Sequence, residues 1–515
     1  RPYPRQSRHC GGRSDGIYVK GGEDGMLYDV IVIGAGAVGA LAARELSRYD
    51  LRVCLLERDE DVAMGTTRAN SAIVHGGFDP LPGTLKARLN VRGTAMMPAL
   101  AEQLQVPYRG NGSLVLAFSP EDKKAIEQLY QRGIVNGVPG LSVLAGEEVR
   151  ALEPQVSERV TGALRCTSSG IVCPYELAIA AVGNAMDNGV ELCTDFRVER
   201  IEKTDRGFCL YAGGEQAEGR YVLNCAGLYA DEIADMLGEQ TAPIIPRRGE
   251  YLLLDKNAGG LVSHTLFQVP TPAGKGVLIT PTVDGNLLIG PTSHEVASKE
   301  NRDVTGEGLE EIRRAASRAV EDLPLRQVIR SFSGVRASLA GGDFVLRPST
   351  EWPQFWHALG IDSPGLSAAP AIAEELVRGL AQAGLILRKK PDFRPERPSC
   401  RVFHSLDTAA KNRMIAEDPR YGHVICRCET VTEGEIVAAI HQNPPARTLD
   451  AVKRRTRTGM GRCQGGFCTP YLTEILAREW GIPEEAVMQF GSHAPVLAGR
   501  TKGGEEDVAC EGPTS

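Results

Sequence analysis

The sequence has no excess of positive charge and no long apolar run. Its 58 Lys and Arg residues are outnumbered by 65 Asp and Glu residues, which gives a formal net charge of −7. General nucleic-acid binding requires a basic surface, so this balance argues against it. Every apolar stretch is broken by Gly, Pro or a charged residue before it reaches membrane-spanning length. The sequence also contains no repeat of solenoid length, which argues against a repeat architecture.

Apolar character is also missing from the first residues. Residues 1–25 are polar, contain Gly and Arg, and lack the apolar segment of a secretory signal or an anchor, so we expect a disordered extension. The Gly- and Glu-rich residues 499–515 are expected to form a disordered tail. The thirteen cysteines, an odd number, fit a reducing compartment better than a disulfide framework. We therefore expect a cytoplasmic protein, with any membrane association made through a partner.

A nucleotide-binding pattern occupies Tyr28 to Glu57. The β-branched run Asp29–Ile33 predicts a buried parallel strand, and Gly34, Gly36 and Gly39 follow it in the spacing G-x-G-x-x-G. The first glycine permits a tight turn, the second lets backbone approach a pyrophosphate, and the third lets the following helix pack on the strand. Glu57 ends the next predicted strand, where an acid accepts hydrogen bonds from a ribose hydroxyl. This combination predicts a dinucleotide site, and the alternative is a glycine-rich turn without a ligand.

Composition and strand patterns suggest the domain organisation. With 515 residues, 42% of them hydrophobic and 24% charged, the chain has the size for two to four globular domains. Strand signals with Asp-Gly and Gly-Asn turns dominate from Pro243 to Pro291 and predict an antiparallel sheet. Upstream, Glu191–Ile201 and Phe208–Ala212 resemble the two strands of a hairpin. We predict a large domain at 27–387, a proline-rich linker at 388–420 and a small module at 421–480.

Four cysteines in the small module are grouped as ligands. Cys426 and Cys428 form C-R-C, and Cys463 and Cys468 form C-Q-G-G-F-C, with helical stretches between the pairs. One of these helices begins at Thr432 with a capping box. Four thiolates on loops at helix ends can hold a [2Fe–2S] cluster. Structural zinc is the alternative, although zinc sites usually use C-x₂₋₄-C rather than C-x-C. Basic residues around the module either offset the cluster charge and dock an acidic electron-transfer partner, or form a solvated helix face; they are Lys453, Arg454, Arg455, Arg457 and Arg462.

Six short motifs of the chain together resemble those of a known protein family. The glycine motif with Glu57 is joined by the His75-Gly-Gly loop, NCAGLYAD (224–231), IGPT (289–292), GVR (334–336) and GIDSPG (360–365). Together they resemble the D-amino-acid-oxidase-type superfamily of FAD-dependent oxidoreductases over roughly residues 27–385. The segment 69–93 is similar to the L-2-hydroxyglutarate dehydrogenase and FAD-linked glycerol-3-phosphate dehydrogenase branches. The cysteine module resembles the bacterioferritin-associated-ferredoxin-like domain.

This resemblance implies an α/β fold, with a Rossmann-type FAD-binding domain, an antiparallel-sheet substrate domain and a small helical iron–sulfur module. It implies FAD, rather than NAD, in the dinucleotide site. A flavin exchanges electrons in pairs or singly, so it can couple a two-electron oxidation to a cluster. The expected cofactor-binding residues are Gly34, Gly36, Gly39, Glu57, Ala226, Gly227, Gly360, Pro364 and Gly365.

Two residues are candidates for the chemistry. His75 is the candidate base that removes a hydroxyl proton as hydride leaves the substrate, and its alternative is a residue that only positions the flavin. Arg336 is the candidate clamp for a carboxylate or phosphate, and its alternative is a structural ion pair. Lys86, Arg248 and Tyr251 are weaker candidates.

Domain order favours glycerol 3-phosphate as substrate, whereas the 360–367 loop, which lacks the Lys of a G-G-K motif, resembles the hydroxyglutarate branch and favours an L-2-hydroxy acid. The alternatives are an amino- or imino-acid dehydrogenase subunit, such as one acting on hydroxyproline or an opine, and a non-catalytic electron-transfer or sensor protein. The expected partner is an electron-acceptor protein or a quinone-linked subunit. The expected assembly is a hetero-oligomer.

Overall fold

The computed structural model describes residues 26–270, 276–499 and 501. It divides into two compact units, residues 1–398 and 399–515, which are treated separately. The expectation of disorder for residues 1–25 lies outside the described residues, as does nearly all of the tail for which the same was expected. No helix among the described residues combines the length and the apolar character needed to cross a bilayer.

The first unit contains a largely parallel sheet built around β1 (Leu27–Ile33). Parallel partners flank β1 on both sides, in the order β12 (Glu215–Asn224), β1, β2 (Val53–Leu56), β9 (Glu191–Cys193). Strand β12 pairs with two further strands in succession. Its first half pairs with β11 (Gly207–Ala212), and its last residues pair with β20 (Phe355–Leu359). The edges are completed by β10 (Arg200–Thr204) and β19 (Val345–Pro348). The carboxyl ends of β1, β12 and β20 therefore open at one edge of the sheet.

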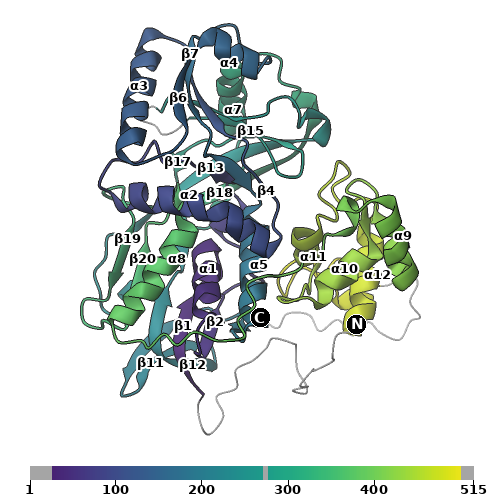
Figure 1. The fold of residues 1–515 in the computed structure, drawn as a ribbon. Coiled ribbons are helices and arrows are strands. Elements are labelled where there is room, and N and C mark those ends of the chain that lie inside the picture. The colour runs from purple at the N-terminus through teal and green to yellow at the C-terminus, as the bar shows by residue number, and fades with distance from the viewer. Residues whose placement is uncertain (1–25, 271–275, 500, 502–515) are drawn as a thin grey trace, which may run out of the picture. The chain divides into compact units, whose positions relative to one another are not determined.

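Both faces of this sheet are buried, which explains the continuous apolar run of β1. Val30 and Val32 pack into the core on the helical face, and Ile31 and Ile33 pack into a second core on the other face. The helices whose residues build the first core are α1 (Ala37–Leu46), α2 (Leu85–Leu104), α5 (Pro174–Asp187) and α8 (Gly365–Gln382). Figure 1 shows α1, α5 and α8 beside the strands, with α2 crossing toward the second sheet.

The second sheet of the same unit is large and mostly antiparallel. Its long strands β13 (Ile244–Leu254) and β18 (Val328–Leu339) pair along the whole of β13. The remaining strands are β5 (Ser113–Ala117), β6 (Leu141–Ala145), β7 (Gly162–Cys166), β14 (Thr265–Gln268), β15 (Leu278–Pro281), β16 (Leu287–Gly290) and β17 (His294–Glu295). One pair, β5 with β14, is parallel. Helices α3 (Pro120–Val135), α4 (Gly146–Leu152) and α7 (Gly306–Ala319) accompany this sheet (Figure 1). The predicted antiparallel substrate domain is thereby confirmed.

The expected strand Glu191–Ile201 is wrong, because the chain turns between two separate strands. Residues Glu191–Cys193 join the parallel sheet beside β2, whereas Arg200–Thr204 pair with β11. Asp195, between them, adopts φ +56°. A small sheet of β3 (Ile73–Val74), β8 (Gly170–Val172) and β4 (Tyr108–Arg109), together with α6 (Ala230–Asp235), completes the unit.

The segment 388–398, predicted as part of a linker, hydrogen bonds to the first unit. The Lys390 N–H donates to the Arg48 carbonyl, and the buried Asn184 amide donates to the Arg394 carbonyl at 2.9 Å. Residues Thr408–Glu417 form helix α9 in the second unit. Residues 388–398 and 408–417 are therefore ordered, and each segment belongs to its own unit.

The second unit is a small helical module with its own core. Its elements are β21 (Val424–Cys426), β22 (Val431–Thr432), α10 (Glu433–His441), α11 (Leu449–Thr456) and α12 (Thr469–Trp480). Ile436, Ile440, Val452 and Leu476 are fully buried between the helices. Thr432 and Glu435 form the capping box that the sequence predicts, with the Thr432 N–H donating to Glu435 Oε2 at 3.0 Å.

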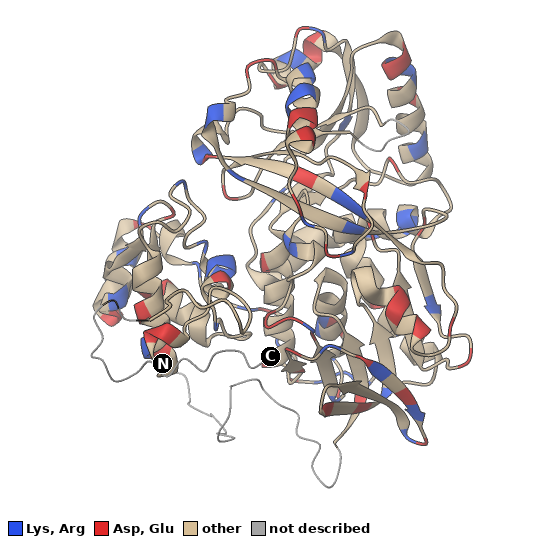
Figure 2. Cartoon of the chain, turned by 180° about the vertical axis from the view of Figure 1, so that it is seen from behind, with Lys and Arg blue, Asp and Glu red and all other residues tan. Residues whose placement is uncertain are grey.

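In Figure 2 Lys/Arg residues and Asp/Glu residues are interspersed along the helices in view.

We expect Gly93→Ala to destabilise the protein. A Cβ at Gly93 of α2 would lie 2.1 Å from the Ser367 carbonyl oxygen in the first turn of α8, so the two helices would have to separate. Overpacking of this kind typically costs about 1–3 kcal/mol. Gly306→Ala is the matched control, because no atom lies within 4 Å of its added Cβ at the start of α7. Thermal unfolding measures both variants, and equal melting temperatures would contradict the assigned helix contact.

Candidate functional site

The turn after β1 brings three stretches of backbone together. Gly34 has φ +95°, and a Cβ there would lie 2.7 Å from the Cys225 carbonyl oxygen at the end of β12. A Cβ on Gly39 would lie 1.9 Å from the Gly34 carbonyl oxygen, so helix α1 could not pack as closely with any other residue. Gly36 is the N-cap of α1, and no side chain of its own caps the helix. The Ala37 N–H donates instead to Thr67 Oγ1 at 2.9 Å.

Glu57 follows β2 and is buried beside this turn. Its carboxylate accepts hydrogen bonds from the N–H groups of Ala35 at 2.8 Å and Asp59 at 3.1 Å. Burial raises the pKa of Glu57 to about 7, and the nearby Asp59 carboxylate adds to this effect. Hydroxyl donors from a ribose would favour the ionised carboxylate and lower the pKa again.

A cavity of about 570 Å³ extends from this turn to the second sheet. Its lining begins with Gly36–Val38 at the start of α1, includes Pro364–Ser367 at the start of α8, and reaches Tyr251 and Arg336 on the second sheet. Neither α1 nor α8 is capped by its N-cap side chain. Helix N-termini carry unsatisfied N–H groups and partial positive charge, which favour anionic ligands. The cavity therefore suits a long ligand with negative charge in more than one place.

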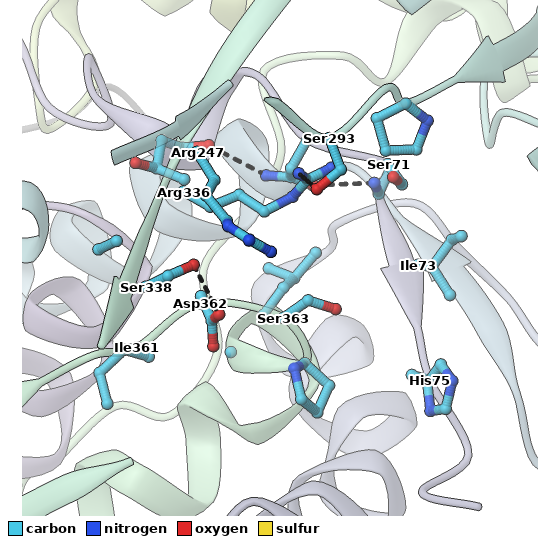
Figure 3. Close-up of a pocket in the computed structure, with 18 of the residues that line it drawn as sticks. Ser71, Ile73, His75, Arg247, Ser293, Arg336, Ser338, Ile361, Asp362 and Ser363 are labelled. Carbon is cyan, nitrogen blue, oxygen red and sulfur yellow. Dashed lines mark hydrogen bonds between the residues drawn. The ribbon is translucent and has the colours of Figure 1, made fainter. Parts of the chain in front are cut away.

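Two arginines lie side by side where the cavity meets the second sheet (Figure 3). Arg247 on β13 and Arg336 on β18 are direct partners in the strand register, so their side chains project from the same face. Arg336 donates to the Thr292 carbonyl oxygen at 3.3 Å and to Ser293 Oγ at 3.5 Å. Neither arginine makes an ion pair with an acid anywhere in the described part of the chain. Like charges on opposed positions repel, so an anion between them would stabilise the arrangement.

Glycines make room for Arg336. A Cβ at Gly249, on the neighbouring strand β13, would lie 2.7 Å from an Arg336 guanidinium nitrogen. A Cβ at Gly334 would lie 1.9 Å from the Ala69 carbonyl oxygen, so this glycine admits the loop that carries Asn70 and Ser71 into the cavity lining. The GVR segment thus combines a close backbone contact with a cavity-facing guanidinium.

His75 lies on the other side of the cavity from the arginines, after β3 (Figure 3). Its backbone N–H donates to Ser367 Oγ at 2.7 Å, and its carbonyl accepts from Asn90 Nδ2 and Thr94 Oγ1. Nδ1 accepts a hydrogen bond from the Gly77 N–H at 3.1 Å. An imidazole that accepts at Nδ1 carries its proton on Nε2 in the neutral form.

The three weaker candidates take structural positions. Arg248 points to the other face of β13 and pairs with the fully buried Glu250 at 3.0 Å. Lys86 pairs with Asp362 at 2.6 Å, and Asp362 also accepts from Ser338 Oγ at 3.0 Å. Tyr251 lines the cavity, where its hydroxyl lies 3.2 Å from Ser71 Oγ.

The remaining candidate residues for cofactor binding separate into two groups. Gly36, Gly227, Pro364 and Gly365 line the cavity. The others lie near the cavity but outside its lining: Gly39 in α1, and Gly34, Glu57, Ala226 and Gly360 in the turns. The Ala226 N–H donates to Asn224 Oδ1 at 3.2 Å, which fixes the turn at the end of β12. Gly360 has φ +67°, and a Cβ there would lie 2.7 Å from Leu339 Cβ.

Sequence reasoning missed Arg247 and Thr67. Arg247 stands next to Arg248 in the sequence, and the alternation of a strand, counted from the cavity-facing Tyr251, was the signal that distinguishes them. Thr67 lies in the segment between β2 and β3, and its contact with the helix end is visible only in three dimensions.

The four predicted ligand cysteines come together as two hydrogen-bonded pairs. Cys426 pairs with Cys468, and Cys428 pairs with Cys463. The hydrogen bond from Cys468 lowers the pKa of the Cys426 thiol to about 6, which favours its thiolate form. Thiolates are the form that binds metal. A set of four thiol donors at one place fits a [2Fe–2S] cluster.

Comparisons with known proteins agree with both sites. The family described as FAD dependent oxidoreductase matches residues 29–378, and the BFD-like [2Fe-2S] binding domain matches residues 424–478. A glycerol 3-phosphate dehydrogenase of Caloramator mitchellensis is 46% identical over 92% of this chain and 99% of its own length. A human mitochondrial L-2-hydroxyglutarate dehydrogenase is 32% identical over 52% of this chain and 61% of its own.

A solved structure extends the likeness to the fold. The dithionite-reduced L-alpha-glycerophosphate oxidase of Mycoplasma pneumoniae with FAD bound aligns with a TM-score of 0.68 and 32% identity. The alignment covers 72% of this chain and 98% of the oxidase. The chain therefore belongs to the FAD-dependent oxidoreductase family, and it carries a BFD-like [2Fe–2S] domain after the flavin domain.

Proposed function

We propose that the protein oxidises glycerol 3-phosphate to dihydroxyacetone phosphate and passes the electrons to an external acceptor. FAD would supply the two-electron acceptor next to the substrate, and the [2Fe–2S] cluster would release the electrons one at a time. The observation that carries the choice of substrate is the Arg247–Arg336 pair on one face of the second sheet. The 46% identity to a glycerol 3-phosphate dehydrogenase supports it.

The arginine pair favours a phosphate over a single carboxylate. A guanidinium binds either group in a bidentate manner, but two adjacent guanidiniums match one compact dianion. L-2-hydroxyglutarate carries its two carboxylates at opposite ends of the molecule, so only one of them could lie between these arginines. The 360–367 loop, which resembles the hydroxyglutarate branch, contributes Asp362 to the lining, and Lys86 pairs with that carboxylate.

Cofactor binding is assigned to the turns around the cavity. The start of α1, shaped by Gly34, Gly36 and Gly39, would hold the pyrophosphate. Glu57 would accept from the ribose, and the start of α8 at Gly365 would face the flavin ring system. The partial positive charge of that helix end would favour negative charge on a reduced flavin.

His75 is proposed to accept the hydroxyl proton of the substrate. Nδ1 is the accepting atom in the neutral ring, because the Gly77 N–H already donates there and Nε2 carries the proton. Proton transfer to Nδ1 requires the Gly77 hydrogen bond to be released. The alternative is that His75 donates from Nε2 to the substrate oxygen and only positions it.

The cluster implies an acceptor outside this chain. The acceptor would be an electron-carrier protein or a quinone-linked subunit, which makes a hetero-oligomer with such a subunit the expected assembly. The described cysteines are all free thiols, including Cys54 and Cys193 with sulfurs 3.6 Å apart. Free thiols fit a reducing, cytoplasmic location.

We expect Arg336→Gln and Arg247→Gln to impair glycerol 3-phosphate oxidation. Loss of one charge-assisted contact costs about 2 kcal/mol, or roughly 30-fold in kcat/KM. Anaerobic bleaching of the flavin by glycerol 3-phosphate and by L-2-hydroxyglutarate, titrated separately, measures the effect for both substrates. Arg326→Gln, an exposed arginine outside the cavity lining, is the control. Bleaching of the unaltered protein by L-2-hydroxyglutarate alone would overturn the proposed substrate.

His75→Gln separates the two roles of the histidine. Glutamine keeps a hydrogen-bond donor but cannot accept a proton, so loss of a base should slow flavin reduction by about 10²–10⁴-fold. The rise of this rate with pH, which reports deprotonation of the base, should disappear as well. Stopped-flow absorbance follows the flavin directly, and the ratio of flavin to protein absorbance shows whether FAD is retained. A loss of less than tenfold with FAD retained would leave His75 a positioning role.

Cys468→Ser tests the route of the electrons. The variant should lose its cluster, since Cys468 is buried and the serine hydroxyl, protonated at neutral pH, is a much poorer ligand to iron than a thiolate. Glycerol 3-phosphate should still bleach the flavin, while reduction of a protein acceptor should fall to background. Iron analysis and visible absorbance measure the cluster, and Cys400→Ser in the same unit is the control. Unchanged acceptor reduction without iron would exclude the cluster from the route.

A further inference from the structure

The cysteine site of the second unit is open on one side. Cys426 and Cys468 are 1% and 2% exposed, whereas Cys428 and Cys463 are only half-buried. The loop after Cys463 contains Gly465 and Gly466, which add no side chain over the site. A cluster held by these four residues would therefore have one buried end and one end near the surface.

Two exposed aromatic side chains border this open side. Phe467, between the last two ligands in the sequence, is 80% exposed. Tyr471, four residues later in the first turn of α12, is 53% exposed. Phe467 directly precedes Cys468, the N-cap of α12, and Tyr471 follows that ligand within the first turn of the helix. Two large exposed apolar side chains this near a ligand in the sequence indicate an interaction site more strongly than a single one does.

The residues next to the outer cysteines leave the open side of the site uncovered. The Gln464 amide donates to the Met460 and Gly461 carbonyls at 3.2 Å and 3.0 Å, so it bends toward its own loop. A Cβ at Gly461 would lie 2.3 Å from Cys428 Cβ, so this glycine lets the two ligand loops meet. The backbone of the outer ligand pair therefore stays accessible from solvent.

The exposed charge beside the outer ligands is positive. Arg427, between Cys426 and Cys428, is exposed, and Arg462, next to Cys463, is exposed as well. Glu429, on the other side of Cys428, is engaged by the buried Arg457 at 2.9 Å. Arg455 is also buried and donates to the Pro444 and Ala451 carbonyls. Arg454 is buried as well, so three of the basic residues expected to surround the module, Arg454, Arg455 and Arg457, are internal.

We propose that Phe467, Tyr471, Arg427 and Arg462 form a docking surface for an acidic one-electron carrier protein. Aromatic residues and arginines are the residue types enriched in binding hot spots. The arginines would orient an acidic carrier, and the aromatic pair would make the short-lived apolar contact beside the outer cysteines. Electron-transfer complexes are small and transient, which this compact surface suits.

The electron balance follows from the proposed function, on which this inference rests. Oxidation of one glycerol 3-phosphate releases two electrons and two protons. The two electrons leave the cluster in two separate encounters, and each encounter reduces one carrier by one electron without forming a covalent bond. The carrier thus approaches the second unit, while the substrate enters the cavity of the first.

Binding measured with both proteins oxidised tests the surface independently of turnover. The full-length protein with both cofactors would be titrated with a flavodoxin, an acidic one-electron carrier, and with cytochrome c, a basic one. Flavodoxin should bind with an affinity that falls as ionic strength rises. Phe467→Ala and the double variant Arg427→Glu/Arg462→Glu should each weaken binding by at least tenfold. Glu474→Lys, three residues beyond Tyr471 on α12, should tighten it.

Matched variants on the same unit control for general effects. Phe490→Ala removes an aromatic side chain that is 53% exposed, and Arg413→Glu reverses an exposed charge on α9. Both should leave the binding unchanged. Reduction of the cluster by the flavin, followed by stopped-flow absorbance, should be equal in all variants, because the substitutions leave the four ligands in place.

The outcomes separate this surface from the proposed reaction. Protein reduced chemically with dithionite, then freed of excess reductant, should reduce flavodoxin quickly, and the Phe467 and arginine variants should do so slowly. This result would stand even if glycerol 3-phosphate failed to bleach the flavin, which would overturn the substrate alone. Equal binding by Phe467→Ala and Phe490→Ala, or tighter binding of cytochrome c than of flavodoxin at low salt, would overturn the docking surface.

Discussion

Positive charge converges on one cavity, and the arrangement of the first unit depends on it. The starts of α1 and α8, neither capped by its own N-cap side chain, open there. Arg247 and Arg336, which form no ion pair within the described residues, lie at opposed positions of two strands beside it. Aligned helix dipoles and adjacent guanidiniums repel each other in the absence of a counter-charge. An anionic cofactor at the helix ends and an anionic substrate at the arginines would remove this repulsion. The same electrostatic requirement thus accounts for both halves of the site.

Close backbone contacts hold these charges in position. Gly34 and Gly39 bring the end of β12, the turn after β1 and helix α1 into contact. Gly93 brings α2 against the first turn of α8, where Ser367 accepts the backbone N–H of His75. Gly334 brings the loop before β3 against β18, beside Arg336. Each contact is one that a Cβ would separate, so the two sheets and the helix ends form one rigid frame around the cavity.

The two cofactor units divide the electron chemistry between them. The flavin unit surrounds its cavity with both sheets, which suits a reaction that must bind substrate and exclude water. The second unit has its own core and leaves the outer cysteines near solvent, which suits transfer to a protein that binds and leaves quickly. A two-electron donor can then bind to one unit of the protein, and one-electron carriers can bind to the other.

The sequence by itself determined the features whose signals are local. The G-x-G-x-x-G turn with Glu57, the capping box at Thr432 and the two cysteine pairs are each encoded within a few residues of spacing, so a dinucleotide site and a site for a [2Fe–2S] cluster or zinc followed from them, and the family resemblance added FAD and the fold class. Tertiary structure alone decided which of two neighbouring arginines faces the cavity. Arg247 does and Arg248 does not, because the register of β13 with the distant strand β18 sets the faces. The division of Glu191–Ile201 between two pairings depends in the same way on strands far away in the sequence. Contacts between distant segments leave no periodic trace in either segment, and this is the physical reason that the structure was needed to find them.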